Sequence, residues 1–402
     1  MNPAARDQPA APLVSVVMAN YQAGDRIIHA MRSVLRQTMA DLELIVSDDG
    51  SNDVSLLHMR RLMAEDSRVR LLTSEANGGP ARCRNRALDA ARGHWIAIVD
   101  SDDIIHPERF ERLLAAAGQH GADIVADDLL LFFEDGTAPR LMLGEGTDRC
   151  FTVSPEQWVR AGVDGSPALG YLKPMIRSSC LGALRYDEAL RIGEDYDLVL
   201  RLLLDGASLL VVPEPYYLYR RHSGSISHRL PVADMEAMIA RQQALVDAHA
   251  PLDAALSAAF AQRQRNLRQG LNYERLVASI KARRWSAALA ALAGNPEHLW
   301  RLWRSFSEGR TRRQAIPPRH VSPLLMLGAS ETAGATDPVP AYLSAVATDW
   351  SAPRPRQVWR ELAARRGLGA IRCIPLDAAG RYAAGFIPEA EVAAPALVRE
   401  PS

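Results

Sequence analysis

The segment Trp95-Ile-Ala-Ile-Val-Asp-Ser-Asp-Asp103 decides the fold, because an apolar run is followed at once by three carboxylates in four residues. The apolar half predicts a buried strand of a parallel sheet, since such strands are covered on both faces and read as continuous hydrophobic runs. The acidic half, Asp100–Asp103, starts where that strand ends. Crowded carboxylates repel each other, and hard cations such as Mg²⁺ or Mn²⁺ are commonly held by one or two carboxylates plus substrate phosphates. A metal-diphosphate site is therefore expected here.

The chain around this segment predicts an α/β fold with a mostly parallel sheet. From Leu13 to about Phe133, short β-branched runs alternate with amphipathic stretches, which is typical of strands covered by helices. The expected strands are Leu13–Ala19, Leu42–Ser47, Val69–Leu72, Trp95–Val99 and Ile124–Ala126. The expected helices are Arg26–Gln37, Val54–Ala64, Pro80–Ala91 and Pro107–Gln119, the last two beginning at prolines. Ligands of such sheets bind beyond the carboxyl ends of the strands.

The remainder divides by composition. Residues 136–170 are rich in Gly and Pro and predict an irregular insertion with one short helix, Pro155–Ala161. A helix at Glu194–Leu204 and a strand at Leu209–Val212 complete this part. The expected organisation is a disordered lead (1–12), a catalytic domain (13–230), a helical domain (231–315) and a partly irregular C-terminal extension (316–402). Helical periodicity runs through roughly Ala293, after which strand signals nearly vanish.

Two further acidic runs stand out in the sequence. Asp48-Asp49-Gly50 follows an apolar strand and can present a carboxylate to a base or ribose, while Glu194-Asp195 opens an amphipathic helix. The competing interpretation of each run is a solvated turn or a helix cap that favours the helix dipole. The acidic runs after successive strands favour the functional interpretation.

Charge and composition exclude several classes of protein. Basic and acidic residues are balanced at 47 each, so no overall charge favours nucleic acid as a partner. The four cysteines show no Cys-x-x-Cys spacing, which argues against a zinc site and favours reduced thiols in a cytoplasmic protein. The first twelve residues lack the pattern of a secretory signal, and no run of 18 apolar residues predicts a membrane span.

Taken in order, the motifs resemble those of the family 2 glycosyltransferases, and more closely the bacterial enzymes that build exopolysaccharides such as succinoglycan. The resemblance covers about residues 13–230. It is carried by Val14-Ser-Val-Val-Met-Ala-Asn-Tyr21, Ser33-Val-Leu-Arg-Gln-Thr38, Ser47–Ser51, Asn77-Gly-Gly-Pro-Ala-Arg-Cys-Arg-Asn85, Asp100–Asp103, Gly193–Leu198 and Tyr219-Arg-Arg-His-Ser-Gly-Ser-Ile-Ser227. It implies the GT-A fold, a nucleotide-sugar donor and inverting transfer of a hexose to a saccharide acceptor.

The resemblance also implies a donor pocket. Ala19 and Tyr21 would line the nucleobase pocket, Asp49 would hydrogen-bond the uracil of a UDP-sugar, and Arg82 would approach the donor. Asp48 would instead brace the loop. The strand end reads Ala-Asn-Tyr-Gln where the family commonly has a Tyr-Asn pair.

The resemblance assigns the metal and the chemistry as well. Asp100 and Asp102 match the family's Asp-x-Asp element, and the direct ligand of Mn²⁺ or Mg²⁺ would be Asp102 or Asp103, with the others on ribose and sugar hydroxyls. His222 would be a further ligand or a diphosphate contact, although a lone histidine is as often structural.

For the transfer step, Asp195 matches the general base and Glu194 would contact a sugar. Lys173 could contact a sugar or phosphate, but an exposed lysine beside a proline turn is the expectation.

The helical tail carries a basic aromatic stretch. Trp300, Trp303 and Phe306 share one side of an expected helix, with five arginines nearby. Such a stretch can lie on the inner leaflet beside a polyprenyl-linked acceptor, or it can pack its aromatics against the protein.

Two alternative functions for the whole chain remain. One is a sugar-nucleotide nucleotidyltransferase, which normally has a basic Gly-rich phosphate loop that is missing after the first strand. The other is an inactive sugar-nucleotide-binding scaffold.

Overall fold

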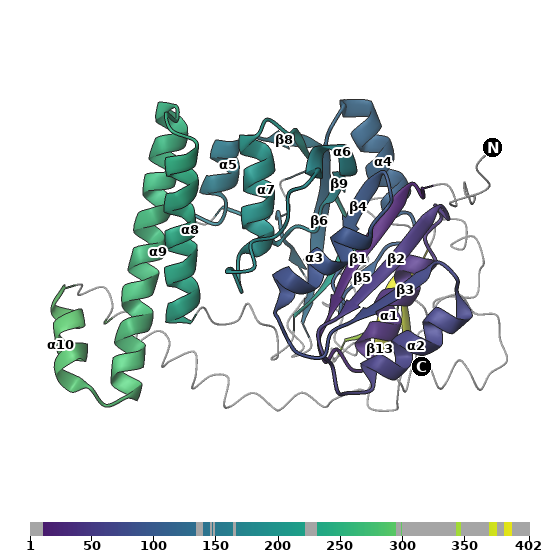
Figure 1. Cartoon of the computed structure of the whole chain (residues 1–402), viewed down its shortest axis with the longest axis horizontal. Coiled ribbons are helices and arrows are strands. Elements are labelled where there is room, and N and C mark those ends of the chain that lie inside the picture. The colour runs from purple at the N-terminus through teal and green to yellow at the C-terminus, as the bar shows by residue number, and fades with distance from the viewer. Residues whose placement is uncertain are drawn as a thin grey trace, which may run out of the picture.

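The computed structural model describes residues 11–133, 140–144, 147, 149–163, 166–221, 231–294, 299, 343–346, 370–375 and 382–387. Its main feature is a mixed sheet flanked by helices (Figure 1). The strands of this sheet are β1 (Val14–Asn20), β2 (Leu42–Asp48), β3 (Val69–Thr73), β4 (Trp95–Ile98), β5 (Ile104–Ile105), β6 (Ile124–Phe133), β7 (Arg140–Leu141), β8 (Phe151–Val153), β9 (Met175–Arg177) and β10 (Leu209–Arg221). They are ordered β3-β2-β1-β4-β9-β6-β10-β5, with β7 on β6 and β8 on β10.

The helices connect these strands and cover the sheet. Those of the first half and the insertion are α1 (Arg26–Leu35), α2 (Ser55–Glu65), α3 (Pro80–Ala90), α4 (Arg109–His120), α5 (Pro155–Arg160), the 3₁₀ turn η1 (Leu169–Tyr171), α6 (Ser178–Leu181) and α7 (Glu194–Leu204). Helix α3 packs on β1 and β2, and α4 packs on β6 and β10. The expected α/β architecture is confirmed, and each expected boundary in this half agrees to within a few residues except at β6 and β10, which run further.

The parallel strands bring the acidic loops to one edge. β1 pairs in parallel with both β2 and β4, so Asn20 lies beside Asp48, and Val17 beside Ile98. The loops that follow these strands therefore leave the sheet on the same side. This is the edge at which ligands of open α/β sheets bind.

An antiparallel strand interrupts this arrangement. β9 lies between β4 and β6 and runs against both, with the Ile98 N–H donating to the Pro174 carbonyl at 3.2 Å. Because the strands are antiparallel, the start of β9 lies at the carboxyl end of β4. Lys173, directly before Pro174, is thereby carried to the acidic edge.

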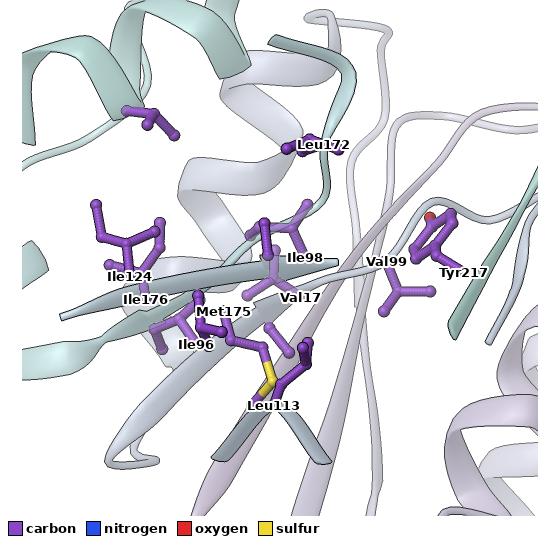
Figure 2. Packing of buried hydrophobic residues seen from close by; sticks show 14 of the residues in the cluster. Val17, Ile96, Ile98, Val99, Leu113, Ile124, Leu172, Met175, Ile176 and Tyr217 are labelled. Atoms are coloured by element: carbon purple, nitrogen blue, oxygen red, sulfur yellow. The ribbon is translucent and has the colours of Figure 1, made fainter. Parts of the chain in front are cut away.

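The core is built on the central strands. Figure 2 shows Ile96 and Ile98 of β4 packed near Met175 and Ile176 of β9, with Leu113 of α4 beside them. All five side chains are at most 3% exposed. Burying an aliphatic side chain of this size contributes about 1.5–3 kcal/mol, which makes the centre of the sheet a rigid base for the loops at its edge.

A helical region follows the sheet, as expected. It consists of α8 (Val232–Ala248), α9 (Ala254–Lys281) and α10 (Trp285–Gly294). Helices α8 and α9 lie side by side, α9 contacts α5, and α10 lies at the outer end of α9 (Figure 1). None of the described helices combines the length and apolarity needed to cross a membrane.

Several expectations need correction. β10 continues through Pro213 and Pro215 to Arg221, with a register shift between Val212 and Tyr217, because each proline lacks the N–H that the ladder needs. Helix α4 begins two residues after Pro107 rather than at it. The insertion also contains β7 and β8.

The expectation that strands nearly vanish after the helical region is wrong for three segments. They form an antiparallel sheet of order β11-β13-β12, from β11 (Leu343–Val346), β12 (Ala370–Pro375) and β13 (Tyr382–Ile387). Their periodicity is too weak in the sequence to separate them from the Pro- and Gly-rich surroundings. The domain limits at residues 13, 230 and 315 stay predictions.

Candidate functional site

Asp48 ends β2 and Asp49 follows it, and the two carboxylates have separate surroundings. The Asp48 carboxylate accepts hydrogen bonds from the Asn20 side chain at 2.8 Å and from the Ser51 N–H at 2.9 Å, so it braces the loop as expected. The Asp49 carboxylate accepts the backbone N–H groups of Gly78 and Gly79 at 2.8–3.1 Å. Asp49 is 3% exposed and ties the loop before α3 to the end of β2.

The other residues expected in the donor pocket border this loop. Ala19 is half-buried at the end of β1, and Tyr21, next along the loop, is 49% exposed. Arg82, in the first turn of α3, is exposed and lies directly over Gly78, where a Cβ would meet its Cδ at 2.7 Å. The Asp49 N–H donates to the Asn20 carbonyl at 2.9 Å, so the end of β1 lies beside the Asp49 loop.

The acidic turn after β4 separates its three carboxylates. Asp100 is paired with Arg84 at 2.9 Å and with Lys173 at 2.8 Å. Burial opposes its ionisation, but the two cations outweigh burial and hold the pKa of Asp100 well below its usual value. Asp102 is half-buried, and its carbonyl accepts a hydrogen bond from Arg220 at 2.9 Å.

Asp103 has a different position from its neighbours. It is 1% exposed, and its carboxylate accepts the Tyr217 hydroxyl at 2.9 Å and the Arg220 N–H at 2.7 Å. Burial, together with the charges of Asp102 and Asp100, raises the pKa of Asp103 well above its usual value. Asp103 thus anchors the acidic turn to β10.

Glu194 and Asp195 lie in the first turn of α7. Gly193 precedes them as the N-cap with a φ of +87°, a left-handed conformation that glycine adopts without strain. Glu194 is paired with Arg84 at 2.7 Å, and Asp195 lies 3.4 Å from the same guanidinium. Burial and the Asp195 charge raise the pKa of Glu194. The helix start thus meets the acidic turn through Arg84.

Lys173 makes the second link between these segments, and the expectation that it is exposed is wrong. It is 5% exposed, and its ammonium lies 2.8 Å from Asp100 and 3.0 Å from Asp195. Burial alone would lower its pKa, but those two carboxylates raise the pKa of Lys173 well above its usual value. The antiparallel placement of β9 causes this burial, and nothing local in the sequence indicates it.

Arg84 is the other residue that the sequence did not single out. It is 6% exposed on α3, and burial opposes its charge, but Asp195, Asp100 and Glu194 raise its pKa well above the usual value. Arg84 belongs to the Asn77–Asn85 motif and lies one turn into a helix that starts at the sheet edge. This position is the sequence feature that could have indicated a role for Arg84 in the site.

Some expected residues lie outside the described part of the chain. His222 and the aromatic stretch of Trp300, Trp303 and Phe306 are among them. Within the described residues, no three His, Cys, Asp or Glu side chains meet as a preformed metal cage. Mg²⁺ and Mn²⁺ sites that share their ligands with a bound diphosphate need no such cage. The donor set fits, because the turn after β4 offers the carboxylate oxygens of Asp100 and of the half-buried Asp102.

Comparison with known proteins identifies the family of this chain. Residues 15–179 match the family model described as glycosyl transferase family 2. The chain is 34% identical over 331 residues to the succinoglycan biosynthesis protein ExoO of Rhizobium meliloti (strain 1021), covering 80% of this chain and 93% of that protein. It is 32% identical over 268 residues to ExoU of the same organism, covering 63% of this chain and 75% of ExoU.

A solved structure agrees on the fold. The crystal structure of S. aureus TarS residues 1–349 in complex with UDP-GlcNAc superposes with a TM-score of 0.51 at 20% identity, over 69% of this chain and 79% of that one. At such low identity the likeness concerns the fold alone, which is of the GT-A type. On the sequence relationship to ExoO and the family match, this chain belongs to glycosyltransferase family 2.

Proposed function

We propose that this protein is an inverting hexosyltransferase that moves a hexose from a UDP-sugar to a lipid-linked or growing exopolysaccharide acceptor. The observation that carries the proposal is the meeting of the acidic turn after β4 with the first turn of α7, through Arg84 and Lys173. One segment supplies carboxylates for the donor side and the other supplies a base for the acceptor side. Two relatives named for succinoglycan biosynthesis support the exopolysaccharide assignment.

Asp195 is the proposed general base. The acceptor hydroxyl oxygen attacks the anomeric carbon from the face opposite the nucleotide, its proton passes to the Asp195 carboxylate, and the bond to the diphosphate oxygen breaks with its electron pair. The products are the inverted glycoside and UDP. Asp195 suits this role because it lies at a sheet edge, is partly exposed and is oriented by two cations. Glu194, held by Arg84, would contact the sugar.

A divalent cation, Mn²⁺ or Mg²⁺, would stabilise the charge that develops on the departing diphosphate. We assign its direct contact to Asp102 rather than Asp103. The reason is that both Asp103 oxygens accept hydrogen bonds in a nearly inaccessible position, whereas Asp102 is half-buried at the edge. Asp100 would contact ribose or sugar hydroxyls, and His222 remains a proposed further ligand.

The nucleotide is proposed to bind over the loop that Asp49 holds. Ala19 and Tyr21 would line the base, Asp49 would accept from the uracil, and Arg82 would approach the donor phosphates or sugar. The exposure of Tyr21 and Arg82 next to this loop supports a pocket open to solvent on the donor side.

We also propose a cytoplasmic location with peripheral contact to the inner leaflet. The segment Ala254–Gly294, which spans α9 and α10, carries seven Lys and Arg residues and one acidic residue, Glu274. On α10, Trp285 is 60% and Leu289 is 67% exposed, and their spacing of four places them on one helix face. Cations beside an exposed aromatic face favour an anionic lipid surface.

The test is release of UDP from a panel of UDP-sugars with Mn²⁺ or Mg²⁺, with and without membrane lipid extract. Wild type is compared with Asp195→Asn and, as a control, with Asp205→Asn, whose side chain is 66% exposed at the far end of α7. We expect turnover to depend on the metal and to be lost in EDTA. It should fall about 10²–10⁴-fold in Asp195→Asn and be kept in Asp205→Asn.

Other outcomes would count against the proposal. Metal-dependent UDP binding without turnover on any donor or extract would favour the scaffold alternative. Failure to bind UDP would refute the donor assignment.

A further inference from the structure

Lysine is scarce in this chain. Only two of its 47 lysine and arginine residues are lysines, Lys173 and Lys281. Lys281 is exposed at the end of α9, whereas Lys173 is 5% exposed at the sheet edge. A chain that uses arginine nearly everywhere else thus has lysine at a buried position among carboxylates.

The contacts explain why lysine suits this position. The Lys173 ammonium reaches Oδ2 of Asp100 at 2.8 Å and Oδ2 of Asp195 at 3.0 Å. An ammonium is a compact charge with three rotatable donors, whereas a guanidinium is a planar fork that matches a single carboxylate. Arg84 spans Asp100 and Glu194 with two different nitrogens, whereas the single Nζ of Lys173 contacts both Asp100 and Asp195.

The backbone of Lys173 is fixed from behind by a buried ion pair. Arg109 and Asp127, both 0% exposed, are paired at 2.8 Å, and Arg109 also donates to the Lys173 carbonyl. The Arg109 guanidinium lies 4.9 Å from the centre of the Tyr217 ring, and the Tyr217 hydroxyl binds Asp103. One scaffold therefore supports both Lys173 and the acidic turn.

We propose that Lys173 is a positioning residue that ties Asp195 to Asp100, so that the acceptor-side base and the donor-side carboxylate are held at one fixed separation. This inference rests on the proposed function. Because Lys173 holds Oδ2 of Asp195, the oxygen that takes the proton is Oδ1, which lies 3.4 Å from Arg84. The charged and titratable groups that act on Lys173 are Asp100, Asp195, Arg84 and Tyr219.

Kinetics of three variants test the role. Lys173→Met keeps the length of the side chain without its charge, Lys173→Arg keeps the charge in another shape, and Lys281→Met is the matched control. We expect kcat to fall about 10–100-fold in Lys173→Met, with partial recovery in Lys173→Arg and none lost in Lys281→Met.

The pH profile separates positioning from a purely structural role. Lys173→Met removes a positive charge that lies 3.0 Å from the proposed base, so the acidic limb of kcat/KM should move to higher pH. Thermal unfolding and UDP binding establish that the variants are folded. Wild-type kcat and an unmoved acidic limb in a folded Lys173→Met would overturn the proposal.

The two lysines also permit a readout that does not depend on activity. Protein labelled with ¹³C at the lysine Cε should give two signals, assigned through Lys281→Met. The Lys173 signal should titrate well above the usual pKa of a lysine, because Asp100 and Asp195 stabilise its charge, and it should move in Asp195→Asn. A Lys173 signal that is unchanged in Asp195→Asn would refute the bridge. A shifted Lys173 signal in a protein that turns over no donor would instead refute the proposed function, and with it the role of Lys173.

Discussion

The Lys173 ammonium lies 3.0 Å from the Asp195 carboxylate, and the same ammonium lies 2.8 Å from Asp100. Lys173 precedes β9, Asp195 opens α7 and Asp100 follows β4. The contact therefore joins three elements that are distant in sequence. An unpaired carboxylate in such crowded surroundings would be costly, so the two cations are what allow several acidic side chains to share this edge.

Asp102 and Asp103 should respond differently to removal of their charge. Asp102→Asn is expected to raise the concentration of Mn²⁺ needed for half-maximal turnover, with thermal stability unchanged, because Asp102 is at the edge. Asp103→Asn is expected to lose about 1–3 kcal/mol of unfolding free energy, because it weakens the contacts with Tyr217 and Arg220. Metal titration of activity and chemical denaturation measure the two effects. Equal metal dependence of the two variants would contradict the assignment.

Arg241 should couple the helical region to the base. It extends from α8 to Asp197 at 2.7 Å and to Asp187 at 3.2 Å, and Asp197 is two residues beyond Asp195. Arg241→Met is expected to cost about 1–3 kcal/mol of unfolding free energy and to lower kcat.

The control is Arg275→Met on α9, whose pair with Glu236 is about half exposed on both sides and should cost at most about 1 kcal/mol. Denaturation and steady-state kinetics of both variants measure this. A kcat unchanged by Arg241→Met would show that α8 does not orient the start of α7.

Glu43 should contribute a pH-dependent part of stability. Burial opposes its ionisation, but hydrogen bonds from Ser15 and Arg92 outweigh burial and lower the pKa of Glu43 below its ordinary 4.5. A lowered folded-state pKa means that the stabilisation is fully present above the unfolded value and is lost as the pH falls through the folded one. Glu43→Gln should therefore cost about 1–3 kcal/mol at pH 7, and less as the pH falls below 4.5.

Urea denaturation of wild type and variant across this pH range provides the measurement. Glu65→Gln is the control, because Glu65 is 46% exposed on α2. A difference between wild type and Glu43→Gln that does not change with pH would contradict the assigned cause.

The two arginines between α9 and α10 should govern binding to anionic lipid. Arg283 and Arg284 are exposed immediately before Trp285. Arg283→Glu with Arg284→Glu is expected to weaken binding to phosphatidylglycerol vesicles at least about tenfold, since each basic residue contributes about 1 kcal/mol near such a surface.

Co-sedimentation with anionic and with neutral vesicles measures this binding. The control of equal charge change replaces the exposed Arg60 and Arg61 of α2 with glutamate. Equal loss in both double variants would indicate that only net charge matters, and no vesicle binding by wild type would refute the membrane proposal.

The sequence determined the sheet and the acidic edge. The apolar runs of β1, β2 and β4 and the carboxylates after β2 and β4 are local patterns, and the carboxyl ends of parallel strands must emerge together. The start of α3 at Pro80 and of α7 after Gly193 also follows from local backbone preferences.

Only the tertiary structure decided which side chains complete the site. Lys173 looked exposed in sequence and is buried because β9 enters antiparallel between β4 and β6. The sequence alone does not distinguish Asp103 from Asp102. In the structure, Tyr217 and Arg220 of β10 bind the Asp103 carboxylate. Burial and ion pairing depend on which distant segments meet, and a local pattern of residues contains no information about that.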